Sequence, residues 1–290
     1  MNISAFSFLL SVLFSSTLSS CNKSEKAEEE KALTQLNMIN VAYGSDSAQK
    51  MDVYLPANRN TTDTKIALFI HGGSWSGGDK MDFNEAINVL KQKLPDYAMI
   101  NINYRLAYYG RNRFPAQIDD IQSALDFIKN NADKYQVNTD KIVLIGASAG
   151  AHLALLHAYK YNEDNRVKAV VDLFGPTDLT DLYHRHPVPA ASQPVLVNLL
   201  GSTPATNAGL YKAASPINFI TTSTVPTKIF HGAGDYVVPI NQSNALKAKL
   251  QANNVKVDMT VYPTEGHGWY GNNLADTYTK TVQFLKDNVK

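Results

Sequence analysis

The amino-acid sequence predicts an α/β fold in which a mainly parallel sheet carries helices on both faces. From about residue 38 onward, short apolar, β-branched runs alternate with longer segments whose apolar residues recur at helical spacing. One run, residues 141–145, leads directly into Gly146-Ala147-Ser148-Ala149-Gly150 and then into an apolar helical segment. This G-x-S-x-G pattern is typical of a sharp strand-to-helix turn that pushes its serine outward. Strands that alternate with helices in this way indicate one domain with a single sheet.

The predicted elements follow one another from residue 38. Two short strands, expected to be antiparallel, come first, at 38–43 and 51–55. Further strands are predicted at 66–70, 98–104, 141–145, 167–174, 227–231 and 257–262, and helices at about 82–94, 116–133, 151–158, 241–253 and 273–288. Residues 176–226 are rich in proline and lack clear periodicity, which predicts a short cap or lid, with a passive surface loop as the alternative.

Composition and charge exclude several classes of protein. The 290 residues contain 27 basic and 26 acidic side chains, so no electrostatic argument favours nucleic acid as a partner. The sequence has no phosphate-loop signature, dinucleotide fingerprint or zinc-type spacing, and neither a cofactor nor a metal is expected. Cys21 is the only cysteine, which excludes an intramolecular disulfide.

The N-terminal segment predicts export. Residues 1–20 carry no charged side chain and include an apolar run too short to span a bilayer, which is typical of a secretion signal. The run ends in Leu18-Ser19-Ser20-Cys21, which resembles the bacterial lipoprotein box, where the chain is cleaved before the cysteine and its sulfur is lipidated. Residues 21–37 then form a charge-dense tether. We expect a lipoprotein anchored in the outer membrane through Cys21, facing the periplasm or the cell surface; an ordinary signal peptide cut elsewhere is the alternative.

Three loops supply candidate catalytic residues. Ser148 needs a base beside it, because a serine hydroxyl is a poor nucleophile at neutral pH. Asp235 follows the strand at 227–231, and His267 follows the strand at 257–262. Because the carboxyl ends of parallel strands share one edge of a sheet, Ser148, Asp235 and His267 are expected to meet there. This order along the chain is the one found in α/β-hydrolases.

A fourth loop, His71-Gly72-Gly73-Ser74-Trp75, follows the strand at 66–70. Its small residues would let backbone N–H groups approach a developing oxyanion, an interaction worth roughly 3 kcal/mol per donor. Trp75 and Trp269 adjoin motif residues and are expected to wall the acyl or alcohol pocket, although aromatic residues are also common in cores.

Other residues compete for these roles. His71 and His231 each follow a strand and are expected to pack beneath the site, and His152 is expected to pack or hydrogen-bond one turn after Ser148. The remaining alternatives are the solvated or substrate-lining histidines His184 and His186, the helical His157, and the rival acids Asp172, Asp178 and Glu265. Arg105 is expected to form a structural ion pair with Asp119 or Asp120, with carboxylate binding as the alternative.

With these motifs in place, the sequence resembles the α/β-hydrolase superfamily over nearly all of residues 38–288, in particular esterases that carry H-G-G-x-W. It is most similar to the feruloyl- and acetyl-esterase-like group of Bacteroidota, which is related to the hormone-sensitive-lipase and kynurenine-formamidase groups. Further stretches that carry the resemblance are Gly77-Gly78-Asp79-Lys80, Asn103-Tyr104-Arg105-Leu106, Phe114-Pro115-Ala116-Gln117, Gly175-Pro176-Thr177-Asp178-Leu179 and Asp235-Tyr236-Val237-Val238-Pro239. Carried over from related H-G-G-G enzymes, the oxyanion donors are the N–H groups of Gly73 and Ser74, joined by that of Ala149.

The resemblance implies a serine carboxylesterase acting on small esters, of the acetyl or feruloyl type, linked to small molecules or to glycans. Ser148 would be the nucleophile, His267 the base and Asp235 its orienting acid, without metal or cofactor. An arylformamidase or a peptidase with the same triad is the alternative, and a non-catalytic binding protein on a hydrolase scaffold is a third. The sequence leaves the oligomeric state open.

Overall fold

The structure is a computed structural model that describes residues 32–290. The predicted leader at 1–20, Cys21 and residues 22–31 of the predicted tether lie outside the described residues. Among the residues described, no helix combines the length and the apolar character needed to cross a bilayer.

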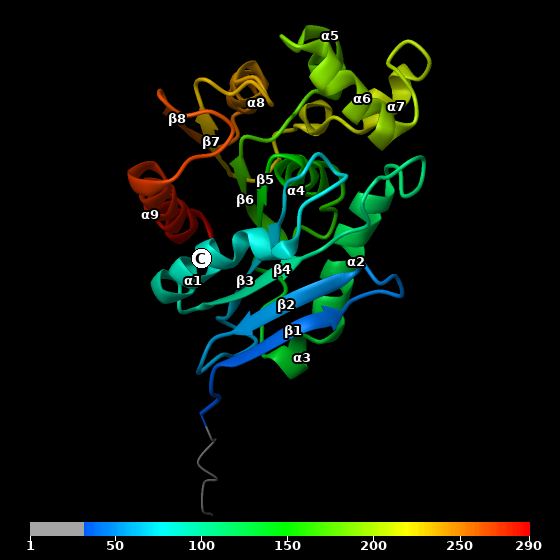
Figure 1. The fold of residues 1–290 in the computed structure, drawn as a ribbon. Helices are drawn as coiled ribbons and strands as arrows, with labels where there is room; N and C mark the ends of the chain where they lie inside the picture. Colours follow the sequence, from blue (N-terminus) through cyan, green and yellow to red (C-terminus); the bar gives the residue numbers. More distant parts are fainter. Residues whose placement is uncertain (1–31) are drawn as a thin grey trace, which may run out of the picture. The chain divides into compact units, whose positions relative to one another are not determined.

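A mixed sheet runs through the described part of the chain (Figure 1). Its eight strands lie in the spatial order β1-β2-β4-β3-β5-β6-β7-β8. β1 and β2 form an antiparallel pair, β2 is antiparallel to β4, and all further pairs are parallel. The strands are β1 (Leu36–Ala42), β2 (Lys50–Leu55), β3 (Lys65–Ile70), β4 (Tyr97–Ile102), β5 (Ile142–Ala147), β6 (Val167–Leu173), β7 (Thr227–Gly232) and β8 (Val257–Tyr262).

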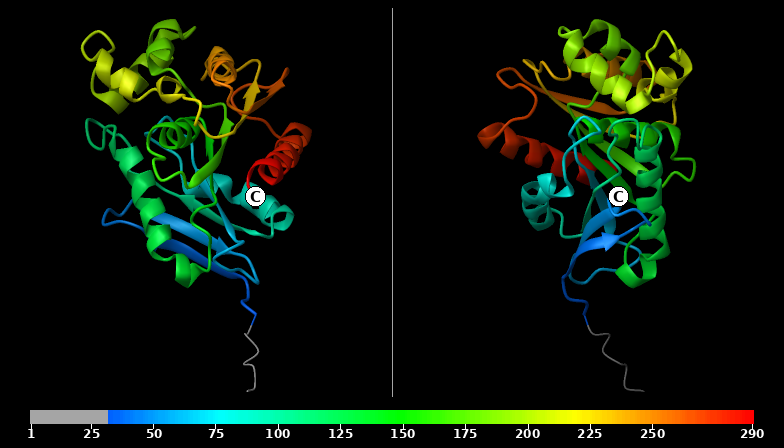
Figure 2. Two further views of the ribbon diagram at one scale, coloured as in Figure 1. Left: turned by 180° about the vertical axis from the view of Figure 1, so that it is seen from behind. Right: turned by 45° about the vertical axis from the view of Figure 1, so that its right-hand side comes forward.

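Helices cover both faces of this sheet (Figures 1 and 2). One face carries α1 (Asn84–Lys93) and α9 (Gly271–Asn288), and the other carries α2 (Ala116–Asn130), α4 (Ala149–Lys160) and α8 (Asn241–Ala252). The central strands are buried on both sides, with alternate residues facing opposite layers. Ile66 and Leu68 of β3 pack toward α2 and α4, whereas Ala67 and Phe69 pack toward α1 and α9. The predicted α/β fold, with helices on both faces, is confirmed.

Several predicted boundaries differ from the structure. β1 begins at Leu36, so the last two residues of the predicted tether belong to the sheet. The helix predicted at about 82–94 begins earlier, as a 3₁₀ turn at Lys80–Phe83 that leads into α1. The turn starts there because the Asp79 carboxylate accepts a hydrogen bond from the Met81 N–H and caps it. The helix predicted at about 116–133 ends at Asn130 and is followed by the short α3 (Ala132–Tyr135).

Residues 176–226 are more regular than their sequence suggests. They form α5 (Leu179–Arg185), α6 (Pro189–Leu200), α7 (Ala208–Ala213) and a 3₁₀ turn at Pro216–Phe219. Leu182 of α5 and Leu196 of α6 are buried and line a cavity beside Ser148. We call this segment the cap helices, because it covers the sheet edge where the strands end (Figure 1).

Candidate active site

Ser148 occupies a tight turn between β5 and α4. Its φ of 53° and ψ of −118° place it in a backbone region that non-glycine residues rarely adopt. Gly146 and Gly150 make the turn possible: a Cβ at Gly146 would collide with the Gly150 carbonyl, and one at Gly150 would collide with the Ile70 carbonyl. The Ser148 N–H donates to the Leu173 carbonyl at 2.8 Å, which fixes the turn against the end of β6.

The structure brings Ser148, His267 and Asp235 into one hydrogen-bonded line. The Ser148 Oγ lies 3.0 Å from His267 Nε2, and His267 Nδ1 lies 2.7 Å from Asp235 Oδ2. Because a carboxylate can only accept, Nδ1 carries the proton of a neutral imidazole and Nε2 presents its lone pair to the serine hydroxyl. The line is therefore arranged to take a proton from Ser148.

Asp235 is held as a carboxylate at neutral pH. Its Oδ1 accepts from the N–H groups of Val237 and Val238, at 2.8 and 2.9 Å, and its Oδ2 lies 3.3 Å from His231 Nε2. Burial alone would raise the pKa of this carboxyl, but the hydrogen bonds from His231, His267 and Val238 outweigh burial and hold it well below the usual value. An ionised Asp235 keeps the imidazole of His267 in the orientation described above.

The loop after β3 has the shape required of an oxyanion site. Gly73, Ser74 and Trp75 have φ values of 100°, 53° and 59°, and a Cβ at Gly73 would collide with the Gly77 carbonyl. The Gly73 carbonyl accepts from the N–H groups of Ser76 and Gly77, at 3.0 and 2.9 Å, which closes the loop. Within residues 32–290, the N–H groups of Gly73, Ser74 and Ala149 donate to no protein acceptor. Ala149 also starts α4, where the helix dipole favours negative charge.

A small cavity of about 50 Å³ lies between this loop and the cap helices. Ser74, Trp75, Ser148 and Ala149 line one side, and side chains that include Leu182 and Leu196 line the other. His267 is not among its lining residues. In a serine hydrolase the leaving group receives its proton from the imidazole, so in an enzyme of that kind this cavity would hold the acyl end of the substrate.

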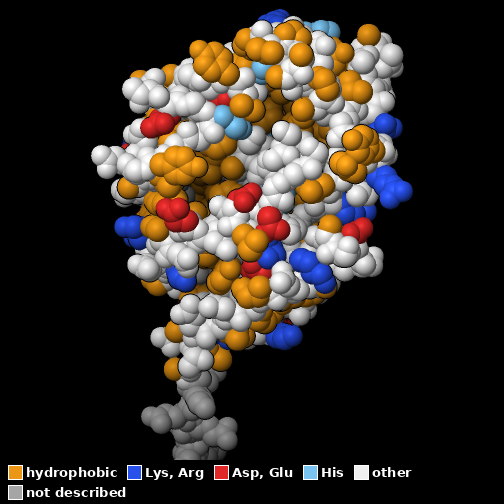
Figure 3. Space-filling model, viewed as in Figure 1, with side chains coloured by type: hydrophobic (Ala, Val, Ile, Leu, Met, Phe, Trp, Pro, Cys, Tyr) orange, Lys and Arg blue, Asp and Glu red, His pale blue; other side chains and the backbone are white. Residues whose placement is uncertain are grey.

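Trp75 lies at this cavity, as predicted for a pocket wall, but Trp269 does not. Its indole N–H donates to Thr277 Oγ1 at 2.8 Å. It lines a separate apolar crevice of about 230 Å³ between α1 and α9, part of the face on which Figure 3 shows apolar side chains gathered. Phe174 lies between Trp269 and the site, with its ring centroid 5.3 Å from that of Trp269 and 4.6 Å from that of His267.

Sequence reasoning missed Phe174 and the cap leucines. Phe174 directly follows β6, and residue type alone does not show that its φ is 49° or that its ring packs on His267. Leu182 and Leu196 lie in the segment without clear periodicity, so no pattern singled them out.

The competing histidines and acids have other partners. His71 is buried and stacks on Tyr104 with ring centroids 4.3 Å apart, and burial lowers its pKa. His186 is buried rather than solvated, with Nε2 donating to the Val237 carbonyl at 3.2 Å. The rival acids bond elsewhere: Asp172 accepts from the Gly175 N–H, Asp178 caps α5, and Glu265 accepts from Asn273.

Arg105 forms the structural ion pair that the sequence favours, and Asp120 is its partner. The guanidinium Nη2 and Nε lie 2.6 and 2.9 Å from Asp120 Oδ1, and Asp120 is fully buried. The pair joins the chain after β4 to α2.

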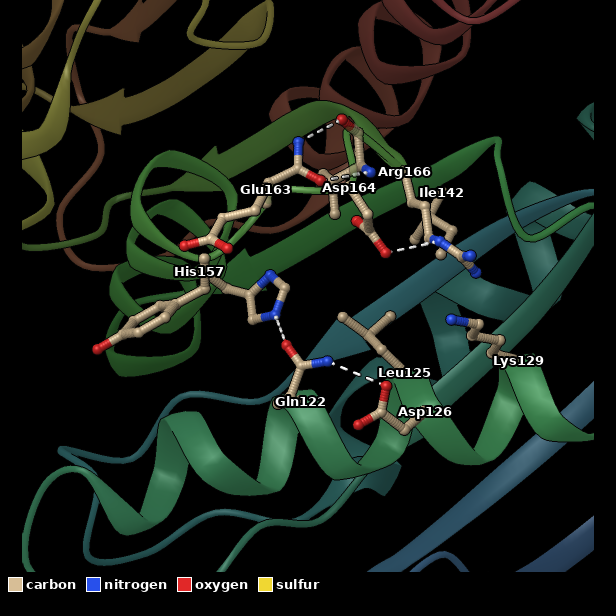
Figure 4. A pocket seen from close by; sticks show the side chains of 12 residues that line it. Gln122, Leu125, Asp126, Lys129, Ile142, His157, Glu163, Asp164 and Arg166 are labelled. Atoms are coloured by element: carbon tan, nitrogen blue, oxygen red, sulfur yellow. Dashed lines mark hydrogen bonds and ion pairs between the residues drawn. The ribbon is translucent and has the colours of Figure 1, made fainter.

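A cavity of about 280 Å³ opens at the other edge of the sheet, at the first residues of β5 and β6 (Figure 4). His157 of α4 points toward Gln122 of α2, with Nε2 donating to Oε1 at 3.0 Å. Burial lowers the pKa of His157 to about 4. None of the predicted site residues lies here, and among the residues described no cluster of three His, Cys, Asp or Glu side chains is placed to hold a metal ion.

Comparisons with known proteins show similarity to proteins named as esterases. Esterase LipC of Mycobacterium tuberculosis is 28% identical over 242 residues, which cover 79% of this chain and 59% of LipC. The probable carboxylic ester hydrolase LipM of the same organism is 30% identical over 225 residues, which cover 73% of this chain and 51% of LipM. The chain thus spans between about half and three-fifths of these curated relatives.

Two solved structures are also similar. A bifunctional GH43-CE protein of Bacteroides eggerthii superposes with a TM-score of 0.74 at 28% identity, covering 87% of this chain and 38% of its own. A truncated carbohydrate esterase from gut microbiota superposes with a TM-score of 0.71 at 26% identity, covering 87% and 98%. The BD-FAE family model matches residues 51–250, well over half of the sequence, a range that includes Ser148 and Asp235 but not His267. The chain belongs to the BD-FAE family.

Proposed function

We propose that this protein is a serine carboxylesterase that removes short acyl groups, of the acetyl type, from carbohydrates. The observation that carries the proposal is the hydrogen-bonded line from Ser148 through His267 to Asp235. At its Ser148 end lie the backbone N–H groups of Gly73, Ser74 and Ala149, which have no protein acceptor among the described residues. Family membership and the similarity to proteins named as esterases support it.

The first half of the reaction acylates the enzyme. Ser148 Oγ attacks the ester carbonyl while His267 Nε2 takes its proton, and Asp235 stabilises the resulting imidazolium without becoming protonated. The tetrahedral oxyanion accepts hydrogen bonds from the N–H groups of Gly73, Ser74 and Ala149. The carbonyl re-forms, the bond to the alcohol breaks, and His267 donates its proton to the leaving oxygen.

The second half frees the acid. A water molecule takes the place of the alcohol, gives its proton to His267 and attacks the acyl carbon. The bond to Ser148 Oγ breaks, and the serine recovers its proton from the imidazolium.

The small cavity favours acetyl over feruloyl as the acyl group. A water molecule needs roughly 10–15 Å³ of such volume, so the cavity of about 50 Å³ holds only a few groups of that size. A phenylpropenoyl group is several times larger than an acetyl group. Trp75 and Leu196, both buried, are among the side chains that line the cavity and limit its size.

Carbohydrate is proposed as the alcohol on the basis of the two similar structures. One is described as a carbohydrate esterase and the other as a bifunctional GH43-CE protein, at 26% and 28% identity. Attachment of the enzyme to the cell envelope through Cys21, which the sequence predicts, would fit a substrate met outside the cytoplasm.

Hydrolysis of p-nitrophenyl acetate and release of acetate from acetylated xylo-oligosaccharides test this proposal. Ser148→Ala should lower kcat by about 10³-fold or more on both substrates, because a nucleophile is lost. Ser123→Ala, which changes a serine of α2 bonded only to its own helix, should keep the wild-type rate. Equal rates for Ser148→Ala and wild type would exclude the proposed nucleophile, and activity restricted to p-nitrophenyl acetate would exclude the carbohydrate.

A further inference from the structure

A buried histidine links the cap helices to the loop that carries the oxyanion donors. The Trp75 indole N–H donates to His152 Nδ1 at 3.2 Å, and His152 Nε2 lies 2.7 Å from the Ala214 carbonyl. His152 is fully buried on α4, one turn after Ser148. Its backbone N–H donates to the Ser148 carbonyl at 3.0 Å. Ala214 directly follows α7.

The two partners fix the tautomer of His152. A carbonyl only accepts, so Nε2 carries the proton, and Nδ1 is left with the lone pair that the Trp75 N–H needs. Burial lowers the pKa of His152 to about 4, so the ring is neutral near pH 7. The imidazole therefore accepts from the oxyanion loop and donates to the cap segment at the same time.

Trp75 is in turn continuous with the oxyanion loop. Gly73, Ser74 and Trp75 follow one another with positive φ, and two of the three carry a side chain for which this conformation is strained. Strained backbone persists only where its surroundings hold it. The Trp75 carbonyl accepts from the Ala107 N–H at 2.8 Å, and the indole is held edge-on to His152 with ring centroids 5.1 Å apart.

We propose that His152 is a positioning residue: by holding the Trp75 indole it aims the N–H groups of Gly73 and Ser74 at the oxyanion and couples their placement to the cap segment. This inference rests on the proposed function, because it concerns the oxyanion site of that reaction. Hydrogen-bond donors stabilise a transition state most when they need no reorganisation at the moment of reaction. The interaction acts on the transition state, so its loss should lower kcat and leave KM nearly unchanged.

Four variants separate the two hydrogen bonds. His152→Leu removes both, and Trp75→Phe removes the indole donor while keeping an aromatic wall. His152→Asn can still offer an oxygen near the position of Nδ1, and His152→Gln can still offer a donor near the position of Nε2. We expect His152→Leu and Trp75→Phe to lower kcat on p-nitrophenyl acetate by about 10-fold. This is less than the loss of roughly 10²–10³ that follows complete removal of one oxyanion donor, because the donors are misplaced rather than removed. His152→Asn should recover most of that loss, and His152→Gln should not.

A double variant tests whether the two residues act as one unit. If they do, Trp75→Phe combined with His152→Leu should be no slower than either single variant, whereas independent effects would multiply. Where His152→Leu fails to fold, Trp75→Phe, His152→Asn and His152→Gln carry the comparison.

Fluorescence reports on Trp75 independently of activity. The chain has two tryptophans, so Trp269→Phe leaves Trp75 as the only tryptophan, whose emission is separated from that of the tyrosines by selective excitation of the indole. In that background His152→Leu should shift the emission maximum of Trp75, and His152→Asn should restore it. A His152→Leu protein that is folded, shows the shifted emission and keeps the wild-type kcat would overturn the inference. Failure of the proposed function is a different result, because Ser148→Ala would then be as active as wild type.

Discussion

At the scale of single residues, the site is built from strained backbone. Ser148, Ser74, Trp75 and Phe174 all have φ between 49° and 59°, and all four lie at the end of a strand or in the loop after it. Each such residue costs on the order of 1–3 kcal/mol, so the surrounding fold must hold it in place. The G-x-S-x-G motif predicts the turn at Ser148. Nothing about the residue types of Trp75 or Phe174 favours a positive φ, so their conformations could not be predicted.

The same scale separates the two aspartates that compete for His267. Asp172 lies near the end of β6, and Asp235 follows the neighbouring strand β7. The sequence pattern favours Asp235 only through its glycine and proline neighbours. The structure places Asp235 Oδ2 at 2.7 Å from His267. Asp172 is fully buried, its Oδ1 accepts from the Gly175 N–H at 2.7 Å, and its Oδ2 has no partner among the described residues.

Asp172 predicts an unusual dependence of stability on pH. Burial raises the pKa of Asp172 to about 7, against the opposing effects of the Gly175 N–H and His231. An unfolded aspartate has a pKa of about 3.9. Between these values the folded state binds more protons than the unfolded state, so the contribution of Asp172 to the free energy of unfolding falls as pH rises from about 4 to about 7.

Asp172→Asn should remove this dependence, because an amide resembles the protonated carboxyl in shape and cannot ionise. Relative to the variant, the wild type should lose roughly 3 kcal/mol of stability between pH 5 and pH 8, because the folded carboxyl stays protonated up to its raised pKa while the unfolded one is already ionised at pH 5. Urea unfolding of both proteins at the two pH values measures the difference, and the other titrating groups cancel in the comparison. If the free energy of unfolding of the wild type minus that of the variant is the same at pH 5 and at pH 8, the pKa of Asp172 is not raised.

At the scale of elements, the sequence predicts the sheet and its covering helices but not the cap helices. Strands such as β3 and β5 are uninterrupted apolar runs, and α2 and α9 have clear apolar faces. α6 is different, because Pro189 stands in its first turn and Pro194 lies inside it. An internal proline removes one helical hydrogen bond and argues against a helix in a single sequence. Packing of Leu196, Leu199 and Leu200 against the rest of the fold overrides that signal.

The face of α6 beside Ser148 should set the acyl-chain preference. Wild type should hydrolyse p-nitrophenyl acetate faster than the butyrate and octanoate esters, because the cavity is about 50 Å³. Leu196→Ala removes part of the cavity wall, so the ratio of kcat/KM for butyrate to that for acetate should rise by about 10-fold.

Leu199→Ala is the matched control for this change. Leu199 is equally buried on α6, but it does not line the cavity. Both leucine variants should lose about 2–5 kcal/mol of stability, and only Leu196→Ala should alter the ratio of the two esters. A similar change in both variants would mean that general loosening of the cap helices, rather than cavity size, controls the chain length.

At the scale of the whole molecule, the proposed chemistry is confined to one edge of the sheet. The Ser148 turn, the Asp235 and His267 loops and the oxyanion loop all follow the carboxyl ends of parallel strands, as the sequence predicts for this kind of sheet. The charged cavity in Figure 4 lies at the amino ends of β5 and β6. The placement of each motif directly after a predicted parallel strand was sufficient to predict this convergence, whereas the proposed acyl cavity depends on tertiary packing of the cap helices.

The last prediction concerns attachment of the chain to a membrane. The apolar, uncharged run before Leu18-Ser19-Ser20-Cys21 predicts lipidation of the only cysteine, and the described sheet begins at Leu36, beyond a charge-dense segment. When the full chain is expressed in a bacterium supplied with labelled palmitate, we expect the label in the protein and the protein in the membrane fraction. Cys21→Ala should abolish both. Its kcat/KM on p-nitrophenyl acetate should equal that of the wild type, because every residue proposed for the reaction lies between Gly73 and His267. A wild-type protein without label would exclude lipidation under those conditions, and a label that survives Cys21→Ala would place the acyl group on another residue.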